Sequence, residues 1–310
     1  MSIRKTFFDD VDKPLKYVLY SDTDSLYINV PSLEPKDPTD AVKFADQVGK
    51  ELNSVIEDFT VNHLLKKMNV SPDHNMTFYK TELTAESILF LNVKKNYCYS
   101  ATSKEGKVYD KPKIKYTGIP VVRNEYSGIT KDFIRSLVED IALSKEVNGK
   151  TDTTKALNNL ATDTWNRLIE DSNKGDFSYI GSNGKWGTSE YKKEPAGLCG
   201  MRLYNTITQT DTFKQMSSGR FVPITIKNQK IFNDLVNPIK NTNPLYIKNT
   251  PFTSIKYLTV PYDYNKQELL DLMKRFTIKV DIDALWNKSV SKSAERIIEA
   301  IKQANGIPLK

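Results

Sequence analysis

The stretch "VLYSDTDSLYINV", residues 18–30, places two carboxylates, Asp22 and Asp24, one residue apart between two runs that are typical of β-strands. The flanking segments "KYVLY" (16–20) and "SLYINV" (25–30) are rich in β-branched and aromatic residues, which favours a strand on each side. The sequence therefore predicts a strand, a tight turn and a second strand. Both carboxylates would be presented at an exposed edge of this hairpin.

Two neighbouring carboxylates at a turn have two explanations. They repel each other unless a cation or a proton lies between them. Mg²⁺ prefers oxygen ligands of this kind, and phosphoryl-transfer enzymes use such pairs to hold two metal ions. Aspartate is also common in turns because it hydrogen-bonds to nearby backbone N–H groups. The pair alone does not decide between a metal site and turn chemistry.

Length and composition indicate a globular protein. The chain has 310 residues and a formal net charge of +7, and 39% of its residues are hydrophobic, which is enough for a sizeable core and two domains. No apolar run approaches the roughly 18–20 residues that span a bilayer, so we expect no membrane association. Two cysteines and two histidines provide neither a disulfide framework nor a Cys/His metal site. We therefore expect an intracellular location.

Most of the net charge lies in one window, Lys94–Arg123. It contains eight basic residues opposed only by Glu105 and Asp110, so it carries +6. Tyr97, Tyr99, Tyr109 and Tyr116 are interleaved with the lysines. Cations neutralise phosphates, and aromatic rings contact sugars and bases. The window is either a nucleic-acid-binding segment or a solvated, lysine-rich hairpin.

The remaining sequence predicts a mixture of helices and strands. A long helix starts near Thr39 or Asp40 and continues to Phe59, and a turn follows at Pro72. Residues 76–122 predict three strands, with turns at Gly106 and Pro112. Further predictions are helices at 130–147, 153–173, 265–275 and 291–304, strands at 220–227 and 254–260, and a long glycine-rich loop at 174–200.

Four segments together resemble the family B DNA polymerases. "LYSDTDSLYI" (19–28) resembles the Asp-Thr-Asp-Ser motif of the palm hairpin, and "KTEL" (80–83) resembles the acidic strand before the Lys-Lys motif. "VKKNYCY" (93–99) is similar to the Lys-Lys-Arg-Tyr motif, with Asn96 in place of arginine, and "KYTGIPVVR" (115–123) is similar to the Lys-x-x-Gly…Arg stretch. All four occur in the family's order and with near-family spacing. The closest likeness is to the C-terminal part of T4-like bacteriophage enzymes.

The resemblance implies an α+β fold. Residues 1–128 would form the C-terminal part of a polymerase palm, an antiparallel sheet with packed helices. Residues 129–310 would form a mostly helical thumb. A phage-encoded protein of this kind would act in DNA replication in the host cytoplasm.

The resemblance also implies roles in catalysis. Asp24 would be the main ligand of catalytic Mg²⁺, and Asp22 would lie beside it and add charge to the metal site. Thr23 and Ser25 would shape the turn. Glu82 would be an acidic residue close to the metal site that does not bind the metal ion directly.

The same resemblance implies contacts with primer–template DNA. Lys95 and Tyr97 would reach the minor groove near the primer end, where every base pair offers an acceptor. Lys94, Lys113, Lys115 and Arg123 would contact the DNA backbone or the minor groove.

A complete polymerase of this family contains further motifs, and no segment of this sequence resembles them. No stretch resembles motif A, with its own metal-binding aspartate, or the helix that binds the incoming deoxynucleoside triphosphate. We therefore expect the C-terminal subunit of a split DNA-directed DNA polymerase, inactive alone. A partner chain would carry motif A, fingers and exonuclease, share the two-metal Mg²⁺ site and cover the apolar edge of the hairpin.

Two further expectations concern partners. T4-like polymerases often end in an aromatic-containing peptide that binds the sliding clamp, but "AIKQANGIPLK" (300–310) has no aromatic residue, so we do not expect this segment to bind a clamp. The alternative function is a non-catalytic DNA-binding or scaffold subunit that keeps a polymerase-derived palm and thumb.

Overall fold

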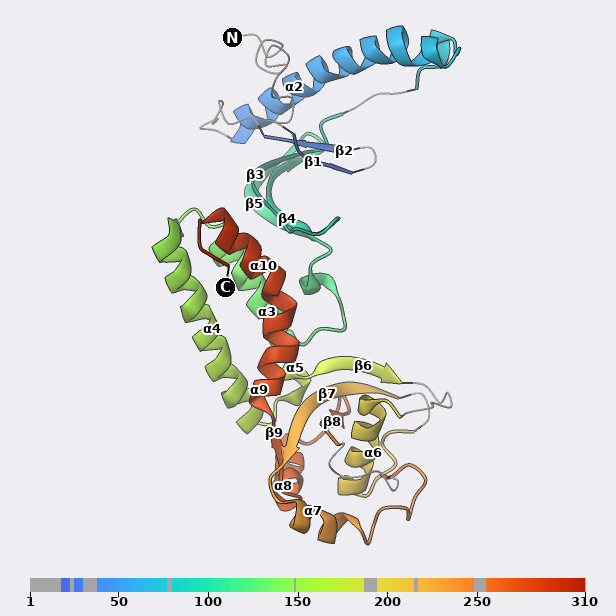
Figure 1. The fold of residues 1–310 in the computed structure, drawn as a ribbon, viewed down its shortest axis with the longest axis vertical. Helices are drawn as coiled ribbons and strands as arrows, with labels where there is room; N and C mark the ends of the chain where they lie inside the picture. Colours follow the sequence, from blue (N-terminus) through green and yellow to red (C-terminus); the bar gives the residue numbers. More distant parts are fainter. Residues whose placement is uncertain are drawn as a thin grey trace. The chain divides into compact units, whose positions relative to one another are not determined.

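The computed structural model describes residues 18–22, 25–29, 38–76, 80–147, 149–186, 194–214, 217–247 and 255–309. The chain forms two compact units. The first comprises Met1–Ile88 and Tyr97–Thr117, and the second comprises Leu89–Asn96 and Gly118–Lys310. Both contain helices and antiparallel strands (Figure 1), so the predicted α+β class is confirmed. The assignment of 1–128 as palm and 129–310 as thumb stays a prediction.

The opening stretch of the sequence forms a β-hairpin in the first unit. Strand β1 (Val18–Asp22) pairs antiparallel with β2 (Ser25–Ile28). Asp22 lies directly opposite Ser25, whose hydroxyl donates a hydrogen bond to the Asp22 carbonyl oxygen at 3.1 Å. The predicted strand–turn–strand is confirmed. Thr23 and Asp24, which connect the strands, lie outside the described residues.

The predicted long helix is present in the same unit. Helix α2 (Pro38–Phe59) continues into a π-helical segment, Thr60–Leu65, and is therefore longer than expected. Val42 and Val48 are buried, and the Thr81 hydroxyl donates to the Ala45 carbonyl oxygen at 3.1 Å. This bond attaches the helix to the segment that leads into the sheet. A 3₁₀ turn, Pro72–His74, confirms the turn predicted at Pro72.

A three-stranded antiparallel sheet follows. Its strands are β3 (Leu83–Phe90), β4 (Tyr97–Lys104) and β5 (Lys107–Thr117), with β4 in the centre. Glu105 and Gly106 connect β4 to β5 with φ values of 50° and 79°. Two consecutive positive φ angles are the signature of the tight hairpin turn that matches strand twist. The three predicted strands and the turn at Gly106 are confirmed.

The turn predicted at Pro112 is wrong, because Pro112 lies inside β5. Ala101 pairs with Lys113 and Ser103 pairs with Val108, so the register is irregular over the intervening residues. Pro112 is exposed in this irregular part of the outer strand β5. Proline cannot donate to a strand ladder, and an irregular edge is where its missing N–H costs least.

Three helices form one part of the core of the second unit. Helix α3 (Gly128–Ser136), with its π-helical continuation Leu137–Ala142, packs beside α4 (Gly149–Asn173) and α10 (Lys292–Ala304) (Figure 1). The predicted helices at 130–147, 153–173 and 291–304 are confirmed, although the first ends at Ala142. Buried side chains from these helices include those of Ile129, Phe133, Leu137, Leu168, Ala294 and Ile297.

The second unit also contains a sheet. Strand β7 (Ser217–Ile226) pairs with β6 (Ser182–Trp186), β8 (Tyr257–Val260) and β9 (Ile278–Val280), all antiparallel. The predicted strands at 220–227 and 254–260 and the predicted helix at 265–275 (α8, Lys266–Arg275) are confirmed. Further helical segments are Pro120–Val122, α5 (Phe177–Ile180), α7 (Gln229–Val236), α9 (Ile282–Leu285) and Trp286–Ser291.

The long loop predicted at 174–200 is wrong where the segment is described, because it contributes α5, β6 and the start of α6 (Ala196–Thr208). Residues 187–193 of the predicted loop lie outside the described residues. Two of the glycines in this segment, Gly181 and Gly200, serve close packing instead. Helix α6 packs on β8, and a Cβ atom at Gly200 would lie 2.6 Å from the Thr259 hydroxyl oxygen. Strand β6 has no strong strand propensity of its own, and its pairing with the distant β7 supplies its order.

Among the described residues, no helix combines the length and apolar character needed to cross a bilayer.

Candidate nucleic-acid interface and metal site

Asp22 lies on the same face of the β1–β2 hairpin as two tyrosines. Tyr20 pairs with Tyr27, and Asp22 pairs with Ser25 two positions further along β1. Because side chains alternate between the faces of a strand, Tyr20, Tyr27 and Asp22 share one face. Asp22 is half-buried. The expected carboxylate pair is described only in part, because Asp24 lies outside the described residues.

The aromatic side chains of the hairpin pack on the start of β4. The ring of Tyr97 lies 5.9 Å from that of Tyr20 and 5.5 Å from that of Tyr27, and the two hairpin rings are 5.7 Å apart. The Tyr27 hydroxyl donates a hydrogen bond to the Tyr97 hydroxyl at 2.9 Å. Burial raises the pKa of Tyr27, and the bond to Tyr97 raises it further. Tyr97, expected to contact DNA, therefore also holds the hairpin that carries Asp22.

Strands β4 and β5 place tyrosines and lysines on one face. Tyr99 lies opposite Lys115, and Ala101 lies opposite Lys113, so these side chains share the face of Tyr97. The Lys113 ammonium lies 4.4 Å from the centre of the Tyr109 ring, a cation–π contact. We call this surface the Tyr–Lys face; it comprises Tyr97, Tyr99, Tyr109, Lys113 and Lys115.

The Tyr–Lys face has the chemistry of a nucleic-acid interface. Lys113 and Lys115 are exposed, whereas Tyr97, Tyr99 and Tyr109 are half-buried. Exposed ammonium groups replace the counterions of a phosphate backbone, and rings fixed at the surface pack against sugars and bases. Burial also raises the pKa of Tyr99, and the neighbouring Tyr97 raises it further.

Sequence reasoning named Tyr99 and Tyr109 only as tyrosines of the basic window, without individual roles, and it did not name Tyr20 or Tyr27 as site residues. The alternating spacing of Tyr97 and Tyr99, and of Tyr109 and Lys113, was a usable signal, because residues two or four apart on a strand share a face. The contact between Tyr27 and Tyr97 had no local signal, since 70 residues separate them.

Glu82 lies beside the far end of β4. The Glu82 carbonyl oxygen accepts a hydrogen bond from the Glu105 N–H at 2.7 Å. Glu82 therefore lies next to the β4–β5 turn, at the opposite end of β4 from Tyr97. The Glu82 side chain is exposed. Its expected role as an acid near the metal site stays a prediction.

Lys94 and Lys95 lie in the turn that connects β3 to β4, within the second unit. The Leu91 N–H donates to the Asn96 carbonyl at 3.0 Å and closes the turn, and Lys95 has a φ of 60°. The Asn96 side-chain amide donates to the Lys94 carbonyl at 2.9 Å. Asn96 thus stabilises the turn locally, at the position where the family has arginine. Both lysine side chains are exposed.

Gly118 joins this turn to the segment that follows β5. It has a φ of 68°, and a Cβ atom there would lie 2.4 Å from the Lys95 carbonyl oxygen and 2.9 Å from the Asn96 side chain. "VKKNYCY" and "KYTGIPVVR" are therefore in contact at Gly118. Further along, the Arg123 guanidinium lies 3.8 Å from the Glu125 carboxylate, with both side chains more than half exposed, a geometry that contributes little to stability.

The described residues contain no group of three or more His, Cys, Asp or Glu side chains arranged to hold a metal ion. Asp22 is a chemically suitable single ligand for Mg²⁺, which commonly takes one or two protein carboxylates and completes its shell with water and substrate phosphates. Such a site would require Asp24 and ligands from elsewhere.

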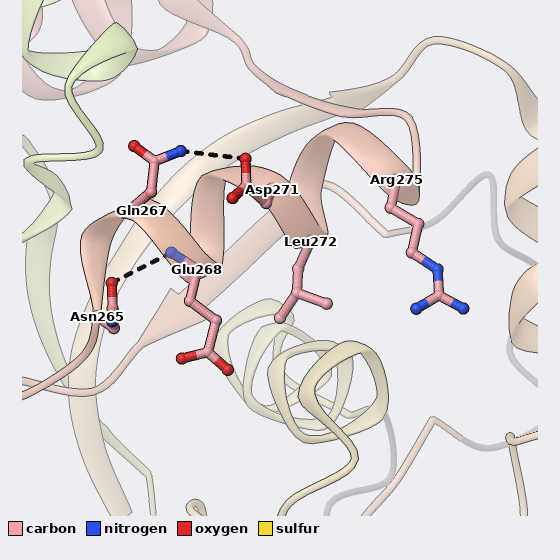
Figure 2. Close-up of a pocket in the computed structure, with 6 residues that line it drawn as sticks. All are labelled: Asn265, Gln267, Glu268, Asp271, Leu272 and Arg275. Atoms are coloured by element: carbon pink, nitrogen blue, oxygen red, sulfur yellow. Dashed lines mark hydrogen bonds between the residues drawn. The ribbon is translucent and has the colours of Figure 1, made fainter.

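Helix α8 of the second unit borders an open pocket (Figure 2). Asn265 caps the helix by accepting the Glu268 N–H at 3.2 Å, and the Gln267 amide donates to Asp271 at 3.1 Å. Glu268 and Leu272 point to the opposite side of the helix from Gln267 and Asp271. None of the predicted site residues lines this pocket, so it is no part of the candidate interface.

Comparisons with known proteins do not assign the chain: no protein-family model matches it, and no curated protein is significantly similar to it.

We predict that Gly118→Ala destabilises the second unit by about 2–4 kcal/mol, because overpacking and a positive φ add their costs. Gly149→Ala is the matched control: its φ is 76°, but no atom lies within 4 Å of the added Cβ, so it should cost only about 1 kcal/mol. Urea unfolding followed by tryptophan fluorescence measures this, since Trp165, Trp186 and Trp286 all belong to the second unit. Equal destabilisation of both variants would contradict the packing of Gly118 on Lys95.

Proposed function

We propose that this chain supplies the C-terminal palm and thumb part of a family B DNA polymerase. It would act with a partner chain that carries motif A, the fingers and the exonuclease. The observation that carries the proposal is the packing of the Asp22 hairpin, through Tyr20 and Tyr27, on Tyr97 of the Tyr–Lys face. A carboxylate beside a polyanion-binding surface is the arrangement that metal-assisted phosphoryl transfer on DNA requires.

The Tyr–Lys face would hold the primer–template. Lys113 and Lys115 would neutralise phosphates, and the tyrosines would pack against sugars and base edges. Lys94, Lys95 and Arg123 belong to the second unit and are exposed, and each would contact phosphates independently of the Tyr–Lys face. These interactions are independent of base sequence, as a replicative enzyme needs.

Asp22 and Asp24 would contribute their carboxylates to a Mg²⁺ site completed by the partner chain. When bound, Mg²⁺ activates the primer hydroxyl and neutralises charge on the triphosphate. Ser25 would support the turn through its bond to the Asp22 carbonyl. The residues of this chain would hold the two carboxylates at a fixed distance from the bound primer end.

The need for a partner is supported by uncovered apolar side chains on the hairpin. Leu19 and Leu26 are each 46% exposed, and β1 and β2 form a sheet of only two strands. A two-stranded sheet is marginal alone, and its open edges are templates for a further strand. A strand from the partner chain would cover this surface.

A non-catalytic DNA-binding subunit remains the second candidate. It is supported by the Tyr–Lys face itself, because exposed lysines and half-buried tyrosines can bind a polyanion without a metal site. Both candidates predict DNA binding, and only the first predicts catalysis.

The double variant Lys113→Gln/Lys115→Gln tests the DNA-binding surface. We expect roughly tenfold weaker binding to a primer–template, irrespective of its sequence. The dependence of log K on log salt should become shallower by about 0.9 for each phosphate that the variant no longer neutralises. Titrations by fluorescence anisotropy at several salt concentrations measure both quantities.

Lys50→Gln is the matched control, because Lys50 is an exposed lysine of the same unit on α2. It should leave both the affinity and the salt dependence unchanged. Equal effects of the control and the double variant would contradict a defined DNA surface on β4 and β5.

Asp24→Asn tests catalysis. Mixed with a candidate partner chain, the wild-type protein should extend a primer in a Mg²⁺-dependent way, and Asp24→Asn should reduce extension by at least about a thousandfold because one metal ligand is removed. DNA affinity should stay unchanged. Asp46→Asn, at an exposed position on α2, should extend as wild type does.

DNA binding without extension by any reconstituted mixture would favour the non-catalytic subunit. Full extension by Asp24→Asn would overturn the proposed role of the acid pair.

A further inference from the structure

Tyr27 connects the acid-bearing hairpin to the surface proposed to hold DNA. It lies on β2, two residues after Ser25, and pairs with Tyr20 of β1. Its ring meets that of Tyr97 edge-on, with an interplanar angle of 65° and centroids 5.5 Å apart, a favourable geometry for aromatic pairs. Its hydroxyl donates to that of Tyr97 at 2.9 Å.

The bond between the two hydroxyls is partly shielded from water. A hydrogen bond in a less polar environment is stronger than an exposed one, and it also fixes the relative rotation of the two rings. Packing of the rings alone opposes separation of the β1–β2 hairpin from β4, but it still allows the hairpin to slide along the surface of β4. The directional bond between Tyr27 and Tyr97 opposes that sliding.

We propose that Tyr27 is a positioning residue, whose hydroxyl bond to Tyr97 fixes the β1–β2 hairpin, and with it Asp22, against the Tyr–Lys face. The catalytic consequence rests on the proposed function. The mechanical part, that this bond holds the hairpin in place, does not.

Two features make the hairpin sensitive to the loss of this bond. It has only two strands, so its own hydrogen bonds cannot hold it at a set angle to β4. Leu19 and Leu26 are each 46% exposed, so these apolar side chains are only partly packed. A displacement of about 1 Å at a catalytic group can cost roughly a hundredfold in rate.

Hydrogen exchange tests the mechanical part directly. Tyr27→Phe removes the hydroxyl and keeps the ring. In the full chain, backbone amides of residues 18–22 and 25–28 should exchange roughly threefold to tenfold faster, as the removal of one partly buried hydrogen bond allows. Exchange in β4 should be unchanged. Unchanged exchange in the hairpin would overturn the proposal.

Tyr262→Phe is the matched control. Its hydroxyl also donates to a side chain, Asn183, at 3.1 Å, but it belongs to the second unit. It should leave exchange in the hairpin unaltered. A double-mutant cycle with Tyr97→Phe adds a specific readout: the effects of Tyr27→Phe and Tyr97→Phe on hairpin exchange should be strongly non-additive, because both remove the same bond. Additive effects would overturn the coupling.

Kinetics on the reconstituted polymerase test the catalytic consequence. Tyr27→Phe should lower kcat for primer extension roughly tenfold, with KM for the triphosphate and Kd for DNA unchanged. Faster hairpin exchange with a wild-type kcat would overturn the positioning role in catalysis. If the wild-type mixture extends no primer, the proposed function fails, while the exchange experiment still decides whether Tyr27 holds the hairpin.

Discussion

The packing of Tyr20 and Tyr27 on Tyr97 is the interaction on which the candidate site depends. Without it, the hairpin would be a two-stranded sheet with two exposed leucines, which is marginal in isolation. With it, a carboxylate lies on the hairpin face that packs against a surface of tyrosines and lysines. Each ring contributes buried apolar area, and the hydrogen bond from the Tyr27 hydroxyl to that of Tyr97 fixes the orientation of the two rings. One aromatic cluster thus joins the proposed chemistry to the proposed binding surface.

A second constraint acts in the other unit, at Gly118. The left-handed backbone at Lys95 brings its carbonyl oxygen so close to Gly118 that no side chain fits there. The Asn96 side-chain amide stabilises the same turn by donating a hydrogen bond to the Lys94 carbonyl oxygen. Two of the segments that resemble polymerase motifs are therefore parts of a single local structure, which presents two exposed lysines. This gives a physical reason for the glycine in "KYTG" that does not depend on the resemblance.

Local sequence was sufficient where local chemistry decides the structure. The β-branched and aromatic runs around Asp22, the helical spacing from Val42 to Phe59 and the turn at Gly106 all predicted what the structure contains. It was insufficient where distant residues decide. Pro112 lies within an irregular edge strand rather than a turn, and Gly200 allows α6 to approach β8 rather than marking a loop. For the candidate site, Lys113, Lys115 and Tyr97 were predicted from motifs. The partners Tyr20 and Tyr27 were not, because ring contacts across 70 residues leave no periodic trace.

The central claim is that primer–template DNA lies on the Tyr–Lys face beside the Asp22 hairpin. Photo-crosslinking tests it most directly: a primer–template with a photoreactive base at the primer end is bound to the full chain, irradiated and mapped by mass spectrometry. Crosslinks are expected at Tyr97, Tyr99 or Tyr109, or at their immediate neighbours on β4 and β5. Crosslinks confined to helices α2 or α8, with none on these strands, would contradict it.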